Sequence, residues 1–389
     1  MTNYDSIYDG IVVIGTSEAT AIATPDAVKA FEKLRNSGEL EGFIRANREK
    51  AWIFIKSLDN AHEILSVGEV VSELADSKDK ANQIWDFITQ IEDQNHQIAI
   101  LAADQTIFEL CHYGKSRESW DFIQSLDNPN DQIRILSAEK AVSGFCGHVD
   151  DLSDEVWKFI SRLENPDRQA EILSKAGVVQ ELAGKGKAHE IWHFLFPRPS
   201  LGQIFGLLKN KAEGVEAEDM HVPLNLDNPR HHVKILSAEG AVKGLSDGTQ
   251  GDIDTELFKF IRGLGDQDKT QILSSRHFVF NCSQSDNYGA DNFIHFTLRS
   301  MQALAEPYQV IILSAPRAVQ GFARSGFANA VWDLIQKMKD PRNQIQILSD
   351  TAATDELVRK GVKKEDIIGL KTKLEKVLQS LNQPPILGL

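Results

Sequence analysis

The sequence predicts an all-α fold: a right-handed α-solenoid of about nine two-helix repeats, each of about 36 residues, with helical caps. An aromatic or large apolar residue recurs at nearly even steps, and all six tryptophans of the chain occupy this column. An Ile-Leu-Ser triplet recurs downstream of most of these positions. The intervening apolar residues follow helical rather than strand spacing. Because one such unit cannot bury its own apolar faces, neighbouring repeats are expected to pack on one another.

The stretch Trp120–Phe145 shows the repeat most clearly. Trp120, Ile123 and Leu126 recur at three-residue steps, which is the spacing of a helix that buries one face. A second helix is expected to begin at Asn128–Pro129, because Asn is a favoured N-cap and Pro suits the first helical position. We expect that second helix to continue to the end of the stretch, so that each repeat is a helical hairpin.

Three columns of residues define the copies. The aromatic column consists of Trp52, Trp85, Trp120, Trp157, Trp192, Met220, Phe258, Phe296 and Trp332. The serine column consists of Ser137, Ser174, Ser237, Ser274, Ser314 and Ser349. The glutamine column consists of Gln97, Gln132, Gln169, Gln271, Gln309 and Gln344.

Each column has an expected role. The aromatic residues are expected to form the core, and the glutamines to hydrogen-bond the turn between the two helices. The serines are expected to be small residues at a close helix crossing, because a catalytic nucleophile needs a single Ser with its own base.

Along the chain, residues 1–49 are expected to form an N-terminal segment and a capping helix. The repeat array follows over residues 50–360, with an irregular repeat near 192–220 where prolines interrupt the pattern. Residues 361–389 are expected to form a C-terminal cap and tail, with an amphipathic helix over Lys364–Leu381.

Composition limits the function classes. The net charge of −14 argues against binding to a phosphate backbone, which depends on clustered Lys and Arg. The three cysteines have no disulfide or metal-ligand spacing, which is typical of a reducing compartment. No segment has the length and apolarity of a membrane span. We therefore expect a cytoplasmic protein, or one in the cytosol of a host if it is a secreted effector.

The repeats over residues 50–360 resemble the broad class of αα-hairpin solenoids, which includes tetratricopeptide, pentatricopeptide and HEAT repeats. The Gly-Tyr pair that follows the Trp in tetratricopeptide repeats is absent, and pentatricopeptide arrays, which bind RNA, are commonly basic, unlike this acidic chain. The resemblance implies a stacked helical architecture and a role in protein binding.

The second and third residues after each serine of the serine column vary freely, whereas their neighbours stay apolar. The charged and imidazole side chains at these positions are Glu139, Lys140, Glu239, Arg276, His277 and Arg317. One interpretation is a solvated face without a role. The other is a partner-facing stripe along the array, and these six residues are its candidate contacts.

One motif offers a catalytic alternative. His189-Glu190-Ile191-Trp192-His193 has the H-E-x-x-H pattern and resembles the zinc-metallopeptidase signature. His189 and His193 would hold Zn²⁺, Glu190 would act as general base, and Glu216 could be a third ligand. Against this interpretation, helical geometry turns both histidines away from the apolar face of Trp192, toward solvent.

Taken together, the residues favour a non-catalytic repeat scaffold without a cofactor, which binds another protein as an adaptor or a bacterial effector. A zinc-dependent metallopeptidase at residues 189–193 is the alternative. A nucleic-acid reader that uses the variable stripe is a third, less favoured class.

Overall fold

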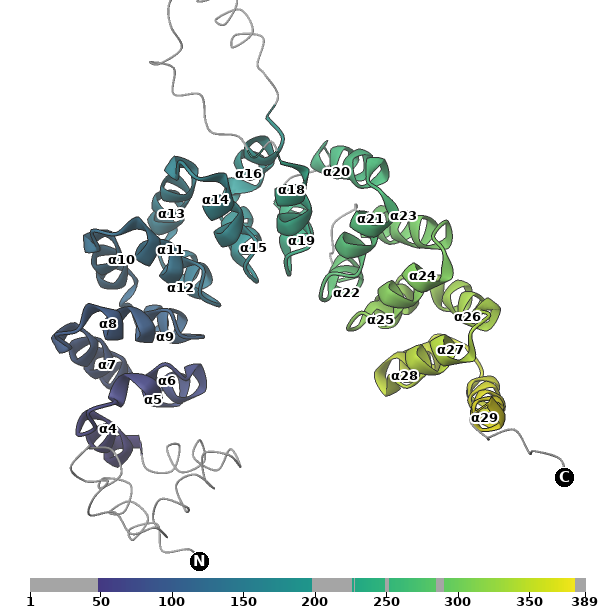
Figure 1. Ribbon diagram of the computed structural model, residues 1–389, viewed down its shortest axis with the longest axis horizontal. Coiled ribbons are helices and arrows are strands. Elements are labelled where there is room, and N and C mark those ends of the chain that lie inside the picture. The colour runs from purple at the N-terminus through teal and green to yellow at the C-terminus, as the bar shows by residue number, and fades with distance from the viewer. Residues whose placement is uncertain (1–47, 198–225, 227, 249–251, 285–289, 382–389) are drawn as a thin grey trace, which may run out of the picture. The chain divides into compact units, whose positions relative to one another are not determined.

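The computed structural model describes residues 48–197, 226, 228–248, 252–284 and 290–381 of the 389-residue chain. Every regular element in this part of the chain is a helix, and none is a strand, so the predicted all-α class is confirmed. The chain divides into two compact units, which meet in sequence between Ile160 and Ser161. Unit 1 precedes this boundary and unit 2 follows it (Figure 1).

Each repeat contains three helices rather than the expected two. In the stretch that begins at Trp120, the second helix ends at Leu136, and a third helix begins only at Ala141. The intervening residue Lys140 has a left-handed backbone (φ 61°), which no α-helix can continue through. The hairpin prediction was therefore wrong at this point, although the apolar spacing across the break is compatible with one helix.

The first helix of each repeat carries the aromatic column. These helices are α4 Arg48–Lys56, α7 Lys78–Gln90, α10 Ser116–Ser125, α13 Asp150–Arg162, α16 Ala188–Leu195, α20 Asp252–Gly263, α23 Ala290–Gln302 and α26 Ala328–Lys337.

The second helix ends at the serine column or its equivalent. These helices are α5 Ala61–Leu65, α8 Gln94–Leu101, α11 Pro129–Leu136, α14 Pro166–Leu173, α18 Pro229–Leu236, α21 Asp266–Leu273, α24 Glu306–Leu313 and α27 Pro341–Leu348.

The third helix is short and leads into the next repeat. These helices are α6 Gly68–Leu74, α9 Thr106–His112, α12 Ala141–His148, α15 Val178–Leu182, α19 Ala241–Asp247, α22 Phe278–Cys282, α25 Ala318–Phe322 and α28 Thr351–Arg359. Two connecting segments, η2 Ala183–Lys187 and η4 Ala323–Phe327, extend α15 and α25 but turn at Gly186 and Gly326.

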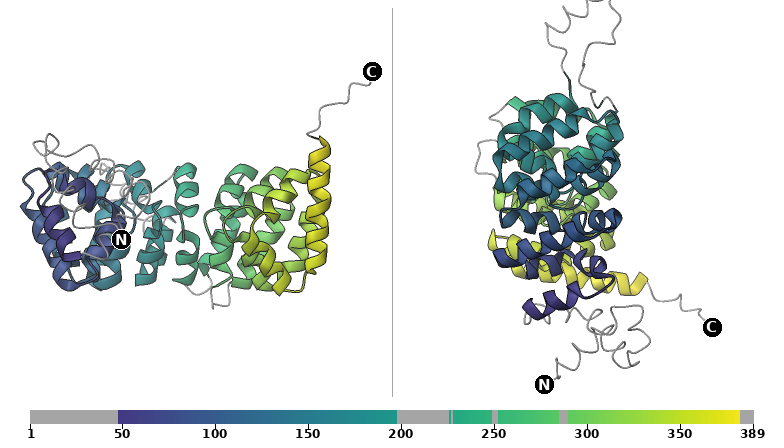
Figure 2. Two further views of the ribbon diagram at one scale, coloured as in Figure 1. Left: turned by 90° about the horizontal axis from the view of Figure 1, so that it is seen from below. Right: turned by 90° about the vertical axis from the view of Figure 1, so that its left-hand side faces the viewer.

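Within each unit, helices of the same rank lie side by side. In unit 2 the first helices α20, α23 and α26 form one row, and the third helices α22, α25 and α28 form another (Figure 1). Second helices contact second helices, and third helices contact third helices, in successive repeats. Helix α29, Lys364–Leu381, packs on α27 at the end of unit 2 (Figure 2) and confirms the predicted C-terminal helix.

The irregular repeat has its helices far apart in sequence. The second helix α18 packs on α14 of the preceding repeat, and α19 packs on both α15 and α16. The repeat that begins with Trp192 is therefore completed by α18 and α19. Met220, which was expected to start a further repeat, lies outside the described residues, as do the expected N-terminal cap and Pro199.

The core follows the aromatic column. All six tryptophans are buried, with exposed fractions between 3 and 8%. The rings of Trp85 and Phe122 form a T-shaped pair with centroids 5.8 Å apart, so this indole contacts the next repeat. The indole of Trp52 does the same through Phe87. One position was assigned to the wrong residue: Leu298 is buried in the aromatic column of α23, whereas Phe296 lies two residues away and is only half-buried.

Polar side chains close the turns as expected, with two exceptions. Gln132 donates to the Leu126 carbonyl (2.8 Å) and Gln169 to the Leu163 carbonyl (2.7 Å), and Gln97 and Gln309 bond the turn in the same way. Gln344 instead donates to the Ile335 and Gln336 carbonyls in the last turn of α26. Gln271 is displaced by two residues in register and instead reaches the Ser237 hydroxyl of the preceding repeat (3.3 Å).

The predicted N-caps are confirmed in both units. The side-chain oxygen of Asn128 accepts from the Asn130 amide (3.0 Å), and Asn228 and Asp340 cap α18 and α27 in the same way. These bonds satisfy an amide that the first helical turn leaves unpaired. The starts of α11, α18 and α27 are therefore fixed by local sequence, which sets where the turn after each helix falls.

Candidate functional site

The turn between second and third helices places one residue in the left-handed region in six repeats. Four of these residues are not glycine: Gln105, Lys140, His277 and Arg317, with φ between 59 and 64°. Gly177 and Gly240 occupy the same place in two other repeats. A left-handed conformation costs a residue with a Cβ roughly 1–2 kcal/mol, which glycine avoids. Side chains are thus kept at four positions where glycine would be easier to accommodate.

All six predicted partner-facing residues lie at these turns. Lys140, His277 and Arg317 are left-handed residues, and Glu139, Glu239 and Arg276 each precede one. We call the surface formed by these turns and the exposed sides of the third helices the third-helix face. Glu139 and Lys140 lie on this face in unit 1, and the other four lie on it in unit 2.

In unit 2 the structure brings the predicted residues together. The Glu239 carboxylate lies 3.8 Å from Nη1 of Arg276 and 3.9 Å from Nε2 of His277. Burial lowers the pKa of the His277 imidazole below its ordinary value, against the opposing attraction of Glu239. The guanidinium of Arg317 lies over the ring of Phe280, 4.8 Å from its centroid.

Five further residues complete this surface, and the sequence interpretation did not include them. They are Phe280, Arg324, Glu356, Arg359 and Lys360. Together with Arg317 they form what we call the arginine patch. A signal in the sequence could have identified two of them, because Phe280 lies one helical turn after His277, and Arg324 two turns after Arg317.

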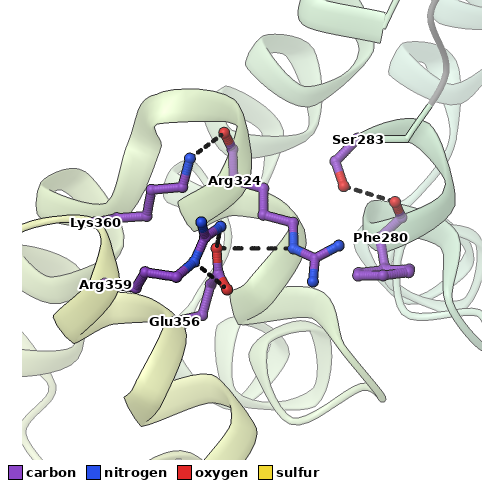
Figure 3. A network of polar contacts seen from close by, with 6 residues as sticks. All are labelled: Phe280, Ser283, Arg324, Glu356, Arg359 and Lys360. Atoms are coloured by element: carbon purple, nitrogen blue, oxygen red, sulfur yellow. Dashed lines mark hydrogen bonds and ion pairs between the residues drawn. The ribbon is translucent and has the colours of Figure 1, made fainter.

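Three neighbouring third helices and the segment after one of them carry the arginine patch. Figure 3 shows Phe280 of α22, Arg324 of η4, which follows α25, and Glu356 and Arg359 of α28. The Arg324 guanidinium lies 4.8 Å from the Phe280 ring centroid, so two arginines share one aromatic ring. Glu356 is buried, forms a bidentate pair with Arg359 and lies 3.7 Å from Nε of Arg324. The Lys360 ammonium donates to the Arg324 carbonyl (3.3 Å).

The buried carboxylate organises the patch. The hydrogen bonds from Arg359 hold the pKa of the Glu356 carboxyl below its ordinary value, with Arg324 acting in the same direction. Glu356 is therefore charged at neutral pH and holds these two guanidiniums on the surface. Arg359 remains largely exposed, and the ring of Phe280 is half-buried.

A glycine crossing explains why the two arginines reach one ring. A Cβ added to Gly321 of α25 would lie 2.8 Å from the Val279 carbonyl and 2.9 Å from Cα of Phe280. Without that Cβ, α25 approaches the backbone of α22 directly. Arg317 lies one turn before Gly321 and Arg324 one turn after it, so both flank Phe280.

Unit 1 repeats this arrangement with fewer cations. A Cβ added to Gly144 would lie 2.7 Å from Cα of Phe108, and the Lys140 ammonium lies 5.8 Å from the Phe108 ring centroid. The rings of His112 and His148 extend the same surface, with centroids 5.3 Å apart. The two units therefore use the same device to present an aromatic ring beside a left-handed cationic residue.

The H-E-x-x-H motif lies on α16, away from the third-helix face. His189, Glu190 and His193 are exposed, as helical geometry predicted. The two imidazole rings stack with centroids 6.3 Å apart, and Glu190 pairs with Lys187 at 3.1 Å. The proposed third ligand, Glu216, lies outside the described residues.

Within the described part of the chain, the donors around this motif are too few for a catalytic zinc. Such a site holds the metal with three protein ligands in a cleft that excludes bulk water. Among the described residues, no group of three His, Cys, Asp or Glu side chains could hold a metal ion. Two exposed imidazoles on a convex helix supply neither the third ligand nor the cleft.

Comparisons with known proteins add no family. The chain matches no protein-family model, and no curated protein gives a significant sequence match. Within the described ranges, no helix has both the length and the apolarity needed to cross a membrane.

Proposed function

We propose that the chain is a non-catalytic helical repeat scaffold that binds another protein through the third-helix face. The observation that carries the proposal is the left-handed turn with a side chain retained. Four repeats keep a Gln, Lys, His or Arg where glycine would relieve strain. Arg317 is exposed and the other three side chains are half-buried, so all four reach the surface from a strained backbone position, which supports a role in binding.

The proposed architecture is an α-solenoid of the kind built by tetratricopeptide, pentatricopeptide and HEAT repeats. The repeats would follow one another in a right-handed array over residues 50–360, about nine in number by the sequence count. Such arrays use a continuous surface of equivalent helices to bind extended partners. The packing of third helix on third helix within each unit supports this architecture.

Three features support a protein partner in the cytosol. The chain is acidic, with a net charge of −14, which disfavours nucleic acid. Its three cysteines are buried thiols rather than disulfides. Aromatic and arginine side chains, which are enriched at protein–protein interfaces, lie together on the third-helix face. We propose an adaptor, or an effector that acts in the cytosol of a host.

A quantitative pull-down with charge-reversed baits tests this function. The baits are the wild type, the patch variant Arg317→Glu/Arg324→Glu, and the unit 1 variant Lys140→Glu, with cytosol from the native cell as prey. The matched control is Arg299→Glu/Arg342→Glu, which reverses two exposed arginines on the first and second helices of unit 2. The proposal predicts a protein that the wild type and the control retain and that at least one face variant loses. Equal recovery of every cytosolic protein on all four baits would contradict the proposal.

The metallopeptidase remains as the alternative because His189 and His193 share one exposed side of α16. Zinc analysis of protein purified without chelators separates the two functions. The scaffold proposal predicts less than stoichiometric zinc, unchanged in His193→Ala. One zinc per chain that His193→Ala removes, together with peptidase activity lost in Glu190→Gln, would favour the peptidase instead.

A further inference from the structure

The arginine patch brings cations together with too few anions. Arg317, Arg324, Arg359 and Lys360 converge around one ring and one carboxylate, Glu356. Like charges at short range repel, and the repulsion is larger where the protein surface excludes water on one side. An arrangement of this kind is stabilised most by an added anion.

Two of the arginines keep donors free for such an anion. Arg317 lies over Phe280 and makes no ion pair with any described residue. Arg324 reaches Glu356 only through Nε, at 3.7 Å, which leaves its terminal nitrogens directed away from that carboxylate (Figure 3). A guanidinium presents a planar fork that matches the two oxygens of a carboxylate. Stacking on an aromatic ring holds that fork in place before a ligand arrives.

The rest of the chain limits the kind of anion. A nucleic acid carries charge along its whole length and would meet the acidic remainder of a chain of net charge −14. A short anionic segment would meet only the patch. The Phe280 ring adds an apolar surface beside the cations, which suits the aliphatic stem of a Glu side chain better than a bare phosphate.

We infer that the arginine patch binds an acidic peptide segment of the partner protein, through carboxylates that engage the Arg317 and Arg324 guanidiniums over Phe280. The inference rests on the proposed scaffold function and names the chemistry that the partner must offer. Arg276 and His277 lie beside the patch and both pair with Glu239, which precedes α19. These contacts extend the site toward α19.

Fluorescence anisotropy tests the inference on the full-length chain. The probe is a fluorescein-labelled peptide of alternating Glu and Gly, and the control peptide carries Gln in place of every Glu. We expect the Glu peptide to bind the wild type, and the Gln peptide to show no saturable binding. Arg317→Ala/Arg324→Ala should raise the Kd of the Glu peptide at least about tenfold, because two charge-assisted contacts are lost. Added salt should weaken binding, as expected of exposed ion pairs.

The matched control is Arg299→Ala/Arg342→Ala, which removes the same charge from other surfaces of unit 2 and should leave the Kd unchanged. Arg317→Lys/Arg324→Lys keeps the charge without the planar fork and should bind with an intermediate Kd. Circular dichroism of each variant shows whether it is folded. If the alanine variant does not fold, the conservative lysine variant still tests the role of the planar guanidinium.

Three results would overturn the inference: no binding of the Glu peptide, an equal Kd in the patch and control alanine variants, or tighter binding of a single-stranded RNA of the same charge through these arginines. Failure here is distinguishable from failure of the scaffold function. If the peptide does not bind but the patch variant still loses its protein in the pull-down, the scaffold function stands and the acidic chemistry is wrong.

Discussion

At the scale of single residues, the left-handed turns place polar side chains on strained backbone, half-buried at Lys140 and His277 and exposed at Arg317. Lys140, His277 and Arg317 combine a backbone that favours glycine with a side chain suited to contact a partner. Arg317 gains back part of this cost through the Phe280 ring, because a cation over an aromatic face contributes about 0.5–1 kcal/mol at an exposed site. An arginine is thus not needed for the turn, because Gly177 and Gly240 occupy the same left-handed position in other repeats.

Comparing Arg317→Ala with Arg317→Gly tests this strain. Both variants lose the guanidinium and its contact with Phe280, but only glycine relieves the left-handed backbone. We expect Arg317→Gly to be more stable than Arg317→Ala by about 1 kcal/mol in urea unfolding. An alanine variant as stable as the glycine variant would show that the turn carries no strain.

The pH dependence of stability depends in part on Glu356. Its pKa is lowered in the folded state, chiefly by the hydrogen bonds from Arg359, so the charged form stabilises the fold. That contribution is complete above the ordinary carboxyl pKa and is lost as the pH falls through the folded-state value. Glu356→Gln should be less stable than the wild type at about pH 7, and the difference should shrink as the pH falls toward about 3.5. Urea unfolding at several pH values measures it, and a difference that does not change with pH would contradict the assignment.

At the scale of elements, close crossings pair the third helices. Gly144 brings α12 onto α9, Gly244 brings α19 onto α15, and Gly321 brings α25 onto α22. In each pair a Cβ on the glycine would lie within 2.9 Å of backbone atoms of the other helix. Backbone cannot move aside as a flexible side chain can, so these glycines fix how closely successive repeats pack.

Alanine at a crossing should therefore act differently from alanine elsewhere in a helix. Gly321→Ala forces α25 away from α22 and is expected to destabilise the chain by about 1–3 kcal/mol, the usual range for overpacking. Gly369→Ala is the control, because Gly369 lies within α29 and an added Cβ meets nothing within 4 Å. It should stabilise by about 0.5–1 kcal/mol through helix propensity. Equal effects on unfolding midpoints would mean that the crossing is not close.

The elements also show where sequence reasoning succeeds and where it stops. Caps, glutamine turns and the helix over Lys364–Leu381 were predicted because each depends on local chemistry. The break before the third helix was not, because the apolar spacing from Ile133 to Val142 also fits a continuous helix. Its signal was present in the glycines at 177 and 240, which share a column with Lys140.

The arginine patch was only partly predictable for a related reason. Arg317, Arg276 and His277 were chosen because their column varies between repeats. Phe280 and Glu356 belong to the site because neighbouring third helices place them there. The helical spacing from His277 could have indicated Phe280, but nothing in the sequence marked Glu356. The contact between Arg324 and Phe280 depends on the crossing at Gly321, which only the structure reveals.

At the scale of the whole molecule, each unit presents a third-helix face with an aromatic ring beside a cation. In unit 1 the ring is Phe108 with Lys140, and in unit 2 it is Phe280 with Arg317 and Arg324. If both sites bind the partner proposed above, the two contacts together raise its affinity without new contacts at either site. A variant changed at both sites should then lose more affinity for the partner than the single-site variants predict.

Site-specific photo-crosslinking in native cytosol tests whether the third-helix face is the binding surface. A photoreactive residue is placed at Glu139 or Arg276 on that face, or at Arg134 or Arg299 on exposed second and first helices, and each chain is irradiated in native cytosol. We expect a discrete adduct with one protein from positions 139 or 276, and none from 134 or 299. Adducts confined to positions 134 and 299 would contradict it.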